Sequence, residues 1–147
     1  MGILVKNIIS QIKDELQVSL RKTDPENCKI LAVYLFGSNV TSKAGRDSDL
    51  DLAFLLSDKD YKDDPLAAVV PAYLAATSIG ISLGMKTDVT ILNASSLEMA
   101  YEAVTTGRCL VENDTDKRIE YEIALRGMYF DFKPFLDELR SNCVSNL

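Results

Sequence analysis

The sequence predicts an α+β domain, with some α/β-like alternation, in which a small mixed sheet is flanked by helices. Short continuous apolar runs, rich in strand-forming residues, stop at glycine or polar residues, as buried strands do. Between them lie longer segments whose apolar residues recur at steps of three and four, as in helices that cover a sheet. The length of 147 residues, 47% apolar and 26% charged, suits a single domain over 1–147 with one core.

The first elements are a helix and a strand. Apolar residues at steps of three and four predict a helix over 6–20, which ends at the turn-forming residues 23–27. The apolar run 30–36 then predicts a buried central strand, because it is continuous and rich in strand formers. This strand stops at Gly37 and Ser38.

The next segments are a loop, a strand and a connector. Residues 39–48 are polar and have no periodicity, which predicts a loop. A second strand is expected over 49–56, where a polar start is followed by a fully apolar run. The charged residues 58–64 are expected to form a connector.

A buried helix and a third strand are expected in the middle of the chain. Asp64 and Pro65 are typical of an N-cap followed by proline at the first helical position. We expect this helix to be kinked or restarted at Pro71 and to close at Gly84. The run 87–93 predicts a third strand, with an aspartate near its start.

Three further elements are expected in the C-terminal part. Ser95 or Ser96 is expected to cap a short helix, and 109–111 to form a short edge strand. A long helix is expected over about 114–140, interrupted near Pro134. Packing in the core is the favoured role of its apolar stripe, and docking on a partner is the alternative. The stripe consists of Ile119, Ile123, Met128, Phe132, Phe135 and Leu136.

Composition excludes several kinds of site. The chain has no histidine, so it has no Ser-His-Asp or Cys-His nucleophilic site and no histidine-based zinc site. Its formal charge is −6 and its pI is about 4.6, which argues against a primary nucleic-acid binder. We therefore expect no direct contact with nucleic acid.

Cysteine usage and hydropathy point to the cytoplasm. Cys28, Cys109 and Cys143 are widely spaced and odd in number, which favours reduced thiols over a disulfide framework. The N-terminal residues lack a continuous apolar signal stretch. The nearly uncharged stretch 65–85 contains two prolines and several small residues, which suits a buried helix better than a membrane span.

Three carboxylates are the candidate chemical groups. Asp49 and Asp51 are two residues apart on a predicted strand, so their side chains point to the same face. Asp88 stands at the polar start of the next strand and reaches the same place if the two strands are neighbours. Because a divalent cation would relieve their repulsion, and Mg²⁺ prefers carboxylate oxygens, these residues are candidate magnesium ligands. A solvated strand end is the alternative for an isolated Asp-x-Asp.

Gly37 and Ser38 are candidate phosphate contacts. Glycine allows a phosphate to approach the backbone closely, and the Ser38 hydroxyl can donate a hydrogen bond to it. Alone, the pair would be an ordinary turn. The sequence has neither a GxGxxG nor a GxxxxGK[ST] pattern, so it predicts no Rossmann site and no P-loop.

Together these motifs resemble the nucleotidyltransferase superfamily related to DNA polymerase beta. Gly37-Ser38, then Asp49-x-Asp51, then Asp88 on a later strand is its spacing, and the chain looks like its minimal, single-domain (MNT) branch. The segment 129–136 is similar to the tail of MntA-type antitoxins of HEPN/MNT toxin–antitoxin systems.

The resemblance implies an activity and a partner. It implies the nucleotidyltransferase fold, and an Mg²⁺-dependent transfer of AMP from ATP onto a tyrosine of a cognate HEPN ribonuclease toxin, which silences the toxin in a hetero-oligomer. It also implies that Asp49, Asp51 and Asp88 hold the metals, with Asp88 as the base for the attacking hydroxyl, and that Gly37 and Ser38 hold the triphosphate.

The chain departs from its relatives at one place. They commonly carry Gly-Ser-x-Ala-Arg-Gly, whereas residues 39–42 here are Asn-Val-Thr-Ser, which leaves Lys43 and Arg46 as candidates to replace the missing arginine. A second hypothesis is therefore an antitoxin that acts by binding and occlusion without catalysis. A third, transfer to a small molecule such as an aminoglycoside, is disfavoured because the chain has no room for an acceptor domain.

Overall fold

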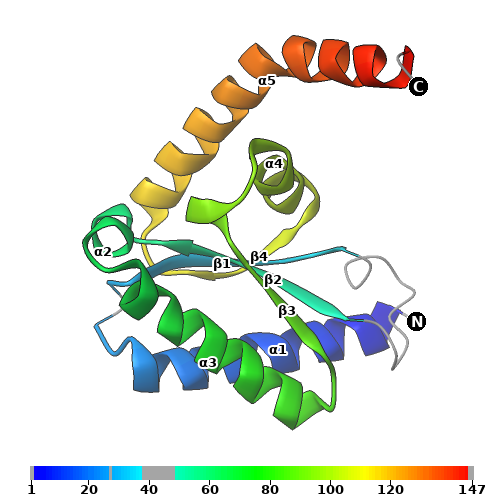
Figure 1. Ribbon diagram of the computed structural model, residues 1–147. Helices are drawn as coiled ribbons and strands as arrows, with labels where there is room; N and C mark the ends of the chain where they lie inside the picture. The colour runs from blue at the N-terminus through cyan, green and yellow to red at the C-terminus, as the bar shows by residue number, and fades with distance from the viewer. Residues whose placement is uncertain (1, 27, 38–48, 146–147) are drawn as a thin grey trace.

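The structure is a computed structural model that describes residues 2–26, 28–37 and 49–145. A four-stranded sheet lies between two groups of helices (Figure 1). In chain order the elements are α1 (Gly2–Thr23), β1 (Ile30–Phe36), β2 (Leu50–Leu56), α2 (Asp58–Asp63), α3 (Pro65–Leu83), β3 (Thr87–Ile91), the 3-10 helix η2 (Leu92–Ala94), α4 (Leu97–Thr106), β4 (Arg108–Glu112) and α5 (Thr115–Ser145).

The sheet is mixed, as the sequence predicts. Its strand order is β3-β2-β1-β4. β1 pairs antiparallel with both β2 and β4, whereas β2 and β3 are parallel. β1 and β2 are buried along almost their whole length, which explains their continuous apolar sequences. The predicted α+β class with helices on a small mixed sheet is confirmed.

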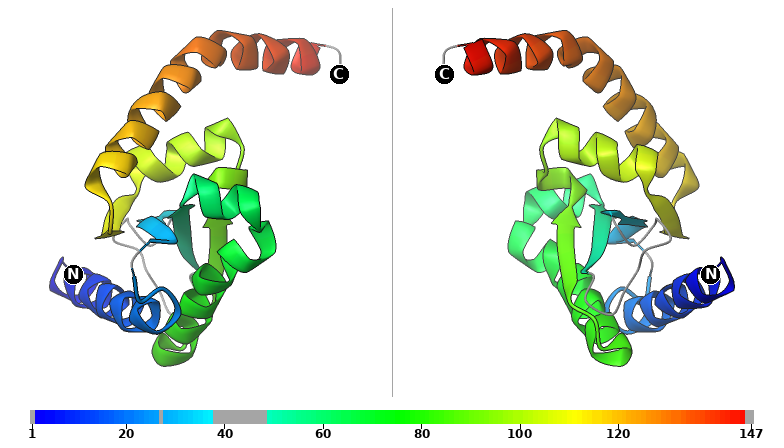
Figure 2. Two further views of the ribbon diagram at one scale, coloured as in Figure 1. Left: turned by 90° about the vertical axis from the view of Figure 1, so that its left-hand side faces the viewer. Right: turned by 90° about the vertical axis from the view of Figure 1, so that its right-hand side faces the viewer.

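Two apolar layers cover the two faces of the sheet. Leu50, Leu52 and Phe54 point to the face that α1 and α3 cover. Ala53 and Leu55 point to the other face, against α4 and the first half of α5. Figure 2 shows these two layers on either side of the strands. Because side chains alternate along a strand, Asp51 belongs to the α4 face and Leu50 and Leu52 to the opposite one.

Two segments differ from the sequence-based expectation. The expected connector 58–64 contains the helix α2, in which Lys62 and Asp58 form an ion pair at 3.0 Å, one helical turn apart. The third strand ends at Ile91 rather than at residue 93. The Asn93 side chain accepts from the Leu56 N–H at 2.9 Å and donates to its carbonyl at 3.0 Å, so it takes the place of the strand ladder there.

The helix α3 begins and ends as expected but is not interrupted. Asp64 accepts a hydrogen bond from the N–H of Ala67, and Gly84 closes the helix with φ +62°. Pro71 lies inside one continuous helix, so the expected restart there is wrong. Within the described residues, α3 is also the one helix whose length and hydropathy would suit a membrane span. Its inner face packs against the sheet through Ala68, Ala72, Ala75, Ala76 and Ile79.

The first turns of α5 are tied to the central strand β1. The Tyr34 hydroxyl donates to Glu122 at 2.8 Å and accepts from Arg118 at 3.2 Å. Arg118 also forms ion pairs with Glu112 at 3.1 Å and Glu122 at 3.3 Å. Burial, then the contact with Glu122, raises the pKa of the Tyr34 hydroxyl, so this side chain stays neutral and can donate.

The apolar stripe of α5 is not core, which corrects the favoured sequence-based interpretation. Leu125 is buried, whereas most of the stripe is between 45% and 67% exposed. The reason is the course of the helix: α5 leaves the sheet and bends (Figure 1), so no described element lies beneath most of the apolar face of its second half. Tyr129 stacks on Tyr101 of α4 with ring centroids 3.7 Å apart, and Arg140 pairs with Glu98. The helix runs without a break through Pro134, so the expected interruption there is wrong.

Candidate active site

Asp51 and Asp88 lie side by side at one end of the sheet. β2 and β3 are parallel, and their register pairs Leu50 with Thr87 and Asp51 with Asp88. Neighbouring strands lie about 4.8 Å apart, and residues directly opposite each other point to the same face. α2 and α3 make this pairing possible, because they carry the chain back to the end of the sheet where β2 begins.

A backbone hydrogen bond joins the starts of these two strands. The N–H of Leu50 donates to the carbonyl oxygen of Lys86 at 2.7 Å. This bond holds the chain next to Asp49 against the chain that leads into Asp88. Sequence reasoning missed Lys86, because no side-chain pattern marks a residue that acts through its carbonyl.

The electrostatics of Asp51 connect all three carboxylates. Its pKa is raised above the usual value near 3.8, first by burial, then by the charge of Asp88, then by that of Asp49. Two neighbouring negative charges disfavour the charged form of Asp51, and a bound cation would offset this repulsion. Hard oxygen donors of this kind suit Mg²⁺.

Gly37 lies against the carboxylate of Asp51. The register of β1 and β2 pairs Phe36 with Asp51, which brings the next residue, Gly37, to the same end of the sheet. Its φ is +84°, in the left-handed region that favours glycine. A Cβ added to Gly37 would overlap Oδ2 of Asp51 and lie 3.2 Å from its Cγ. The missing side chain therefore leaves the space that the Asp51 carboxylate occupies.

The described residues carry part of the predicted site. Ser38, Lys43 and Arg46 lie outside them. Within residues 2–26, 28–37 and 49–145, no group of three or more acidic or cysteine side chains is arranged to hold a metal ion. The strand register pairs Asp51 with Asp88, and the charges of both Asp88 and Asp49 act on the Asp51 carboxylate. That all three bind one metal ion remains a prediction.

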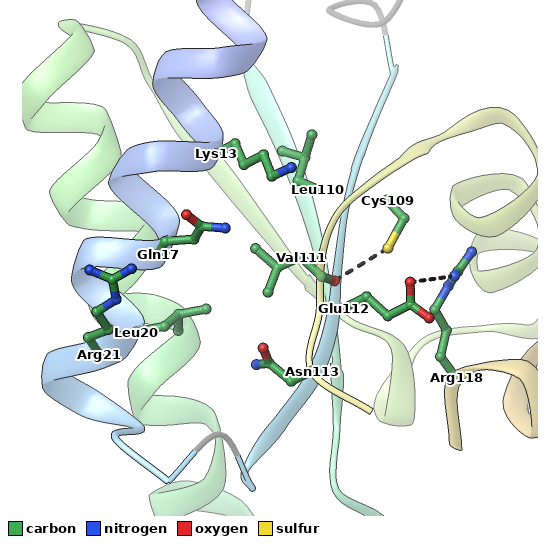
Figure 3. A pocket seen from close by; sticks show the side chains of 10 residues that line it. All are labelled: Lys13, Gln17, Leu20, Arg21, Cys109, Leu110, Val111, Glu112, Asn113 and Arg118. Atoms are coloured by element: carbon green, nitrogen blue, oxygen red, sulfur yellow. Dashed lines mark hydrogen bonds and ion pairs between the residues drawn. The ribbon is translucent and has the colours of Figure 1, made fainter. Parts of the chain in front are cut away.

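Two cavities lie away from these carboxylates. One, of about 640 Å³, separates α1 from the edge strand β4. Figure 3 shows Lys13 and Gln17 extending from α1 toward Leu110 and Val111. The other, of about 1050 Å³, lies at the opposite end of the sheet, where Leu56, Leu92 and Leu125 line it. Neither cavity is lined by Asp51 or Asp88.

Stability should fall with rising pH because of Asp51. Since its pKa is raised in the folded chain, the native state binds this proton more tightly than the unfolded state does. The contribution of Asp51 to the free energy of unfolding should therefore decrease as pH rises through the window just above 3.8. The free energy of unfolding is measured by urea titration at several pH values, with a chelator present, for the wild type and for Asp51→Asn. The difference between the two proteins isolates the effect of Asp51. An equal pH dependence in both proteins would contradict it.

Comparisons with known proteins agree on one family and fold. The family model described as polymerase beta, nucleotidyltransferase, matches residues 18–116. A crystal structure of a toxin–antitoxin with AMP-PNP is 23% identical, with a TM-score of 0.64, over 87% of this chain and 98% of that one. A mutant of the toxin–antitoxin MntA-HpeT is 21% identical, with a TM-score of 0.64 and the same coverage.

A further similar structure comes from Shewanella oneidensis. It is a tri-AMPylated HEPN toxin in complex with an MNT antitoxin, 20% identical with a TM-score of 0.61, over 90% of this chain and 98% of that one. A sequence comparison with curated proteins found no match. At these identities the structures show that the chain shares the fold of antitoxins found in complexes with HEPN toxins.

Proposed function

Because the chain belongs to the polymerase beta nucleotidyltransferase family, we propose that it is an antitoxin that transfers AMP from ATP onto a tyrosine of a HEPN ribonuclease toxin. The observation that carries this proposal is the pairing of Asp51 with Asp88 beside Gly37. The AMPylated toxin in the Shewanella oneidensis complex supports the choice of acceptor. The modified toxin would be neutralised.

The pair Asp51 and Asp88 suits Mg²⁺, because one or two carboxylates and water are what this ion prefers. Asp49 would supply a third carboxylate. Burial and then the charges of Asp88 and Asp49 raise the pKa of Asp51, and a cation would relieve this negative field. When bound, Mg²⁺ would stabilise the charge that develops on the phosphoryl oxygens. The backbone at Gly37, which has no Cβ, and the hydroxyl of Ser38 would hold the triphosphate.

Besides holding the metal and the triphosphate, the protein's residues would position the reacting groups and accept a proton. A carboxylate oxygen of Asp88, which is exposed at the strand start, would accept the proton of the attacking tyrosine hydroxyl. The tyrosine oxygen would bond to the α-phosphorus of ATP while the bond from that phosphorus to the bridging oxygen breaks and pyrophosphate leaves. The rigid pairing of β2 with β3 keeps Asp51 and Asp88 in a fixed relation during this displacement.

The direct test is the mass of the toxin. The product of the gene next to that of this chain, tested as the candidate HEPN toxin, is incubated with the chain, ATP and Mg²⁺, and its intact mass and modified peptides are measured. We expect added AMP on a tyrosine, none in a chelator, and loss of ribonuclease activity in parallel. An unmodified toxin under all conditions would refute the transfer.

Replacing Gly37 with alanine should lower AMP transfer by roughly 10²-fold, because the new Cβ displaces the Asp51 carboxylate. The left-handed backbone should also cost about 1–2 kcal/mol of stability. Gly84→Ala is the matched control, since Gly84 has φ +62° but nothing within 4 Å of the added Cβ. It should lose similar stability and keep its activity. Equal activity of both variants, measured by initial rates, would show that the contact with Asp51 is unimportant.

The exposed apolar stripe of α5 favours a second candidate function, neutralisation by binding and occlusion. Phe132 and Phe135 are 52% and 63% exposed, and such side chains suit a protein interface. The discriminating protein is an Asp49→Asn, Asp51→Asn double variant. If it still neutralises the toxin and the toxin mass does not change, occlusion is sufficient.

Both candidate functions imply a complex with the toxin in the cytoplasm. We propose this location because the three cysteines are free thiols, as in reducing compartments. Neither function requires direct binding to nucleic acid or to a membrane.

A further inference from the structure

The outer face of α3 is apolar and carries no charge. Leu66 and Ile81, near its two ends, are 82% and 79% exposed, and Val70, Tyr73 and Leu74 between them are about half exposed. No charged residue occurs anywhere in the 19 residues of this helix. The complete set of its exposed residues is Pro65, Leu66, Ala67, Val70, Tyr73, Leu74, Thr77, Ile81 and Ser82.

This face is unlike the outer face of α1, the helix that packs beside it. α1 exposes Lys13, Asp14 and Arg21 to solvent, as an ordinary surface helix does. In Figure 1, α3 lies at the front of the molecule with no described element over it. An exposed contiguous apolar patch of this kind indicates a surface that another molecule covers.

The spacing of the exposed residues suits a second helix. Positions 66, 70, 73, 77 and 81 follow steps of three and four, which form one stripe along a helix. A helix of nineteen residues is about 29 Å long. Two such helices packed side by side would bury much of the surface area that each partner buries in a standard interface, roughly 800 Å².

The charges at the two ends of α3 identify its partner. Asp63 and Asp64 stand at its N-terminal end, and Lys86 follows its C-terminal end. A second α3 packed antiparallel would bring each acidic end beside the basic end of its partner, whereas parallel packing would bring like charges together. Antiparallel packing also opposes the two helix dipoles favourably.

We propose that α3 is the contact between two copies of this chain, packed antiparallel about a two-fold axis that passes near Tyr73 and Leu74. In this arrangement Leu66 meets the partner's Ile81, and Val70 meets the partner's Thr77. In a two-fold contact the same surface of each copy faces the other, so a charge near the axis would face its own copy. An uncharged stripe avoids this repulsion. β3 begins directly after α3, so the two Asp88 residues lie at opposite ends of the interface and both sites stay open.

A membrane surface is the less suitable occupant. The inner face of α3 is packed on the sheet, so the helix cannot be surrounded by lipid. The preceding helix α2 carries three aspartates and two lysines, and Asp64 follows it, so this end of α3 is net acidic and an anionic lipid surface would repel it.

The first test is the mass of the purified chain in solution. We expect twice 16.3 kDa in sedimentation equilibrium at micromolar concentration. Leu66→Lys and Ile81→Glu should each raise the dimer dissociation constant at least ~30-fold, since each change acts twice in a symmetric interface and sets a charge beside a like charge of the partner. Ile123→Lys, at a residue of α5 that is 67% exposed, is the matched control and should leave the dimer intact. Circular dichroism checks that all three variants fold.

A second test fixes the orientation. Lys86→Glu should weaken the dimer about 3- to 10-fold, and adding Asp63→Lys should restore it. Tyr73→Cys in a Cys28→Ser, Cys143→Ser background should form an interchain disulfide on oxidation, whereas Ile123→Cys should not. A wild-type monomer at all concentrations overturns the proposal. So does loss of toxin binding or of vesicle binding by Ile81→Glu in a chain that is already monomeric, because the face would then belong to the toxin or to lipid.

Discussion

Asp51→Asn should reduce the rate of AMP transfer by roughly 10²–10³-fold while raising the free energy of unfolding. The loss of rate follows from removing one carboxylate oxygen donor and its charge from the group that would bind Mg²⁺. The gain in stability follows because burial, and then repulsion by Asp88 and Asp49, disfavours the charged Asp51 carboxylate in the folded chain, and asparagine carries no charge. Initial rates of toxin modification and urea unfolding in a chelator measure the two effects.

The combination of these effects is the informative result. Asp14→Asn is the matched control, because Asp14 is an exposed aspartate of α1, away from the sheet. It should change neither the rate nor the stability. If Asp51→Asn keeps full activity, the proposed site is wrong. If Asp51→Asn loses both activity and stability, the Asp51 carboxylate makes a favourable contact in the folded chain. It would then not be a destabilised group that a cation relieves.

Phe54→Ala should lower the free energy of unfolding by about 3–5 kcal/mol, because Phe54 is fully buried in β2 and its removal leaves a cavity in the main core. Phe135→Ala removes the same atoms from a side chain that is 63% exposed on α5. It should change stability by less than about 0.5 kcal/mol. Urea or guanidinium midpoints with equal m-values compare the two variants.

Phe135→Ala also separates packing from partner binding. If α5 contributes to the toxin interface, this variant should bind the toxin more weakly although its stability is unchanged. A large loss of stability would mean that the exposed stripe packs against the body of the protein in solution. In that case the stripe would belong to the core, as its helical periodicity suggests.

The strands were the most predictable part of the fold. The run 30–36 is β1 itself, because a continuous apolar stretch between polar ends has few alternatives to a buried strand. The parts that were missed depend on contacts that a linear pattern does not contain. β3 stops early because Asn93 bonds to Leu56, a residue 37 positions away. The C-terminal stripe has helical periodicity, but periodicity does not say whether a layer lies opposite it.

The candidate site was predictable in part. The parallel register pairs Asp51 with Asp88, as expected if the two strands are neighbours. The expected strand 49–56 begins at Leu50 instead, so alternation along β2 does not place Asp49, and its common face with Asp51 stays a prediction. The overlap between Gly37 and the Asp51 carboxylate could not be predicted, because it depends on the antiparallel register of β1 with β2. Sequence reasoning assigned Gly37 to phosphate approach alone, and the structure adds that it makes room for a carboxylate.

The tie between α5 and β1 has a mechanical consequence. Glu122 and Arg118 fasten the base of a helix about 46 Å long to Tyr34, three residues before Gly37 on the same strand. A load applied to the far end of this helix is therefore shared between α4, which Tyr129 and Arg140 contact, and β1, which ends beside Asp51. A partner that binds α5 is therefore held in a fixed position and orientation relative to the carboxylates.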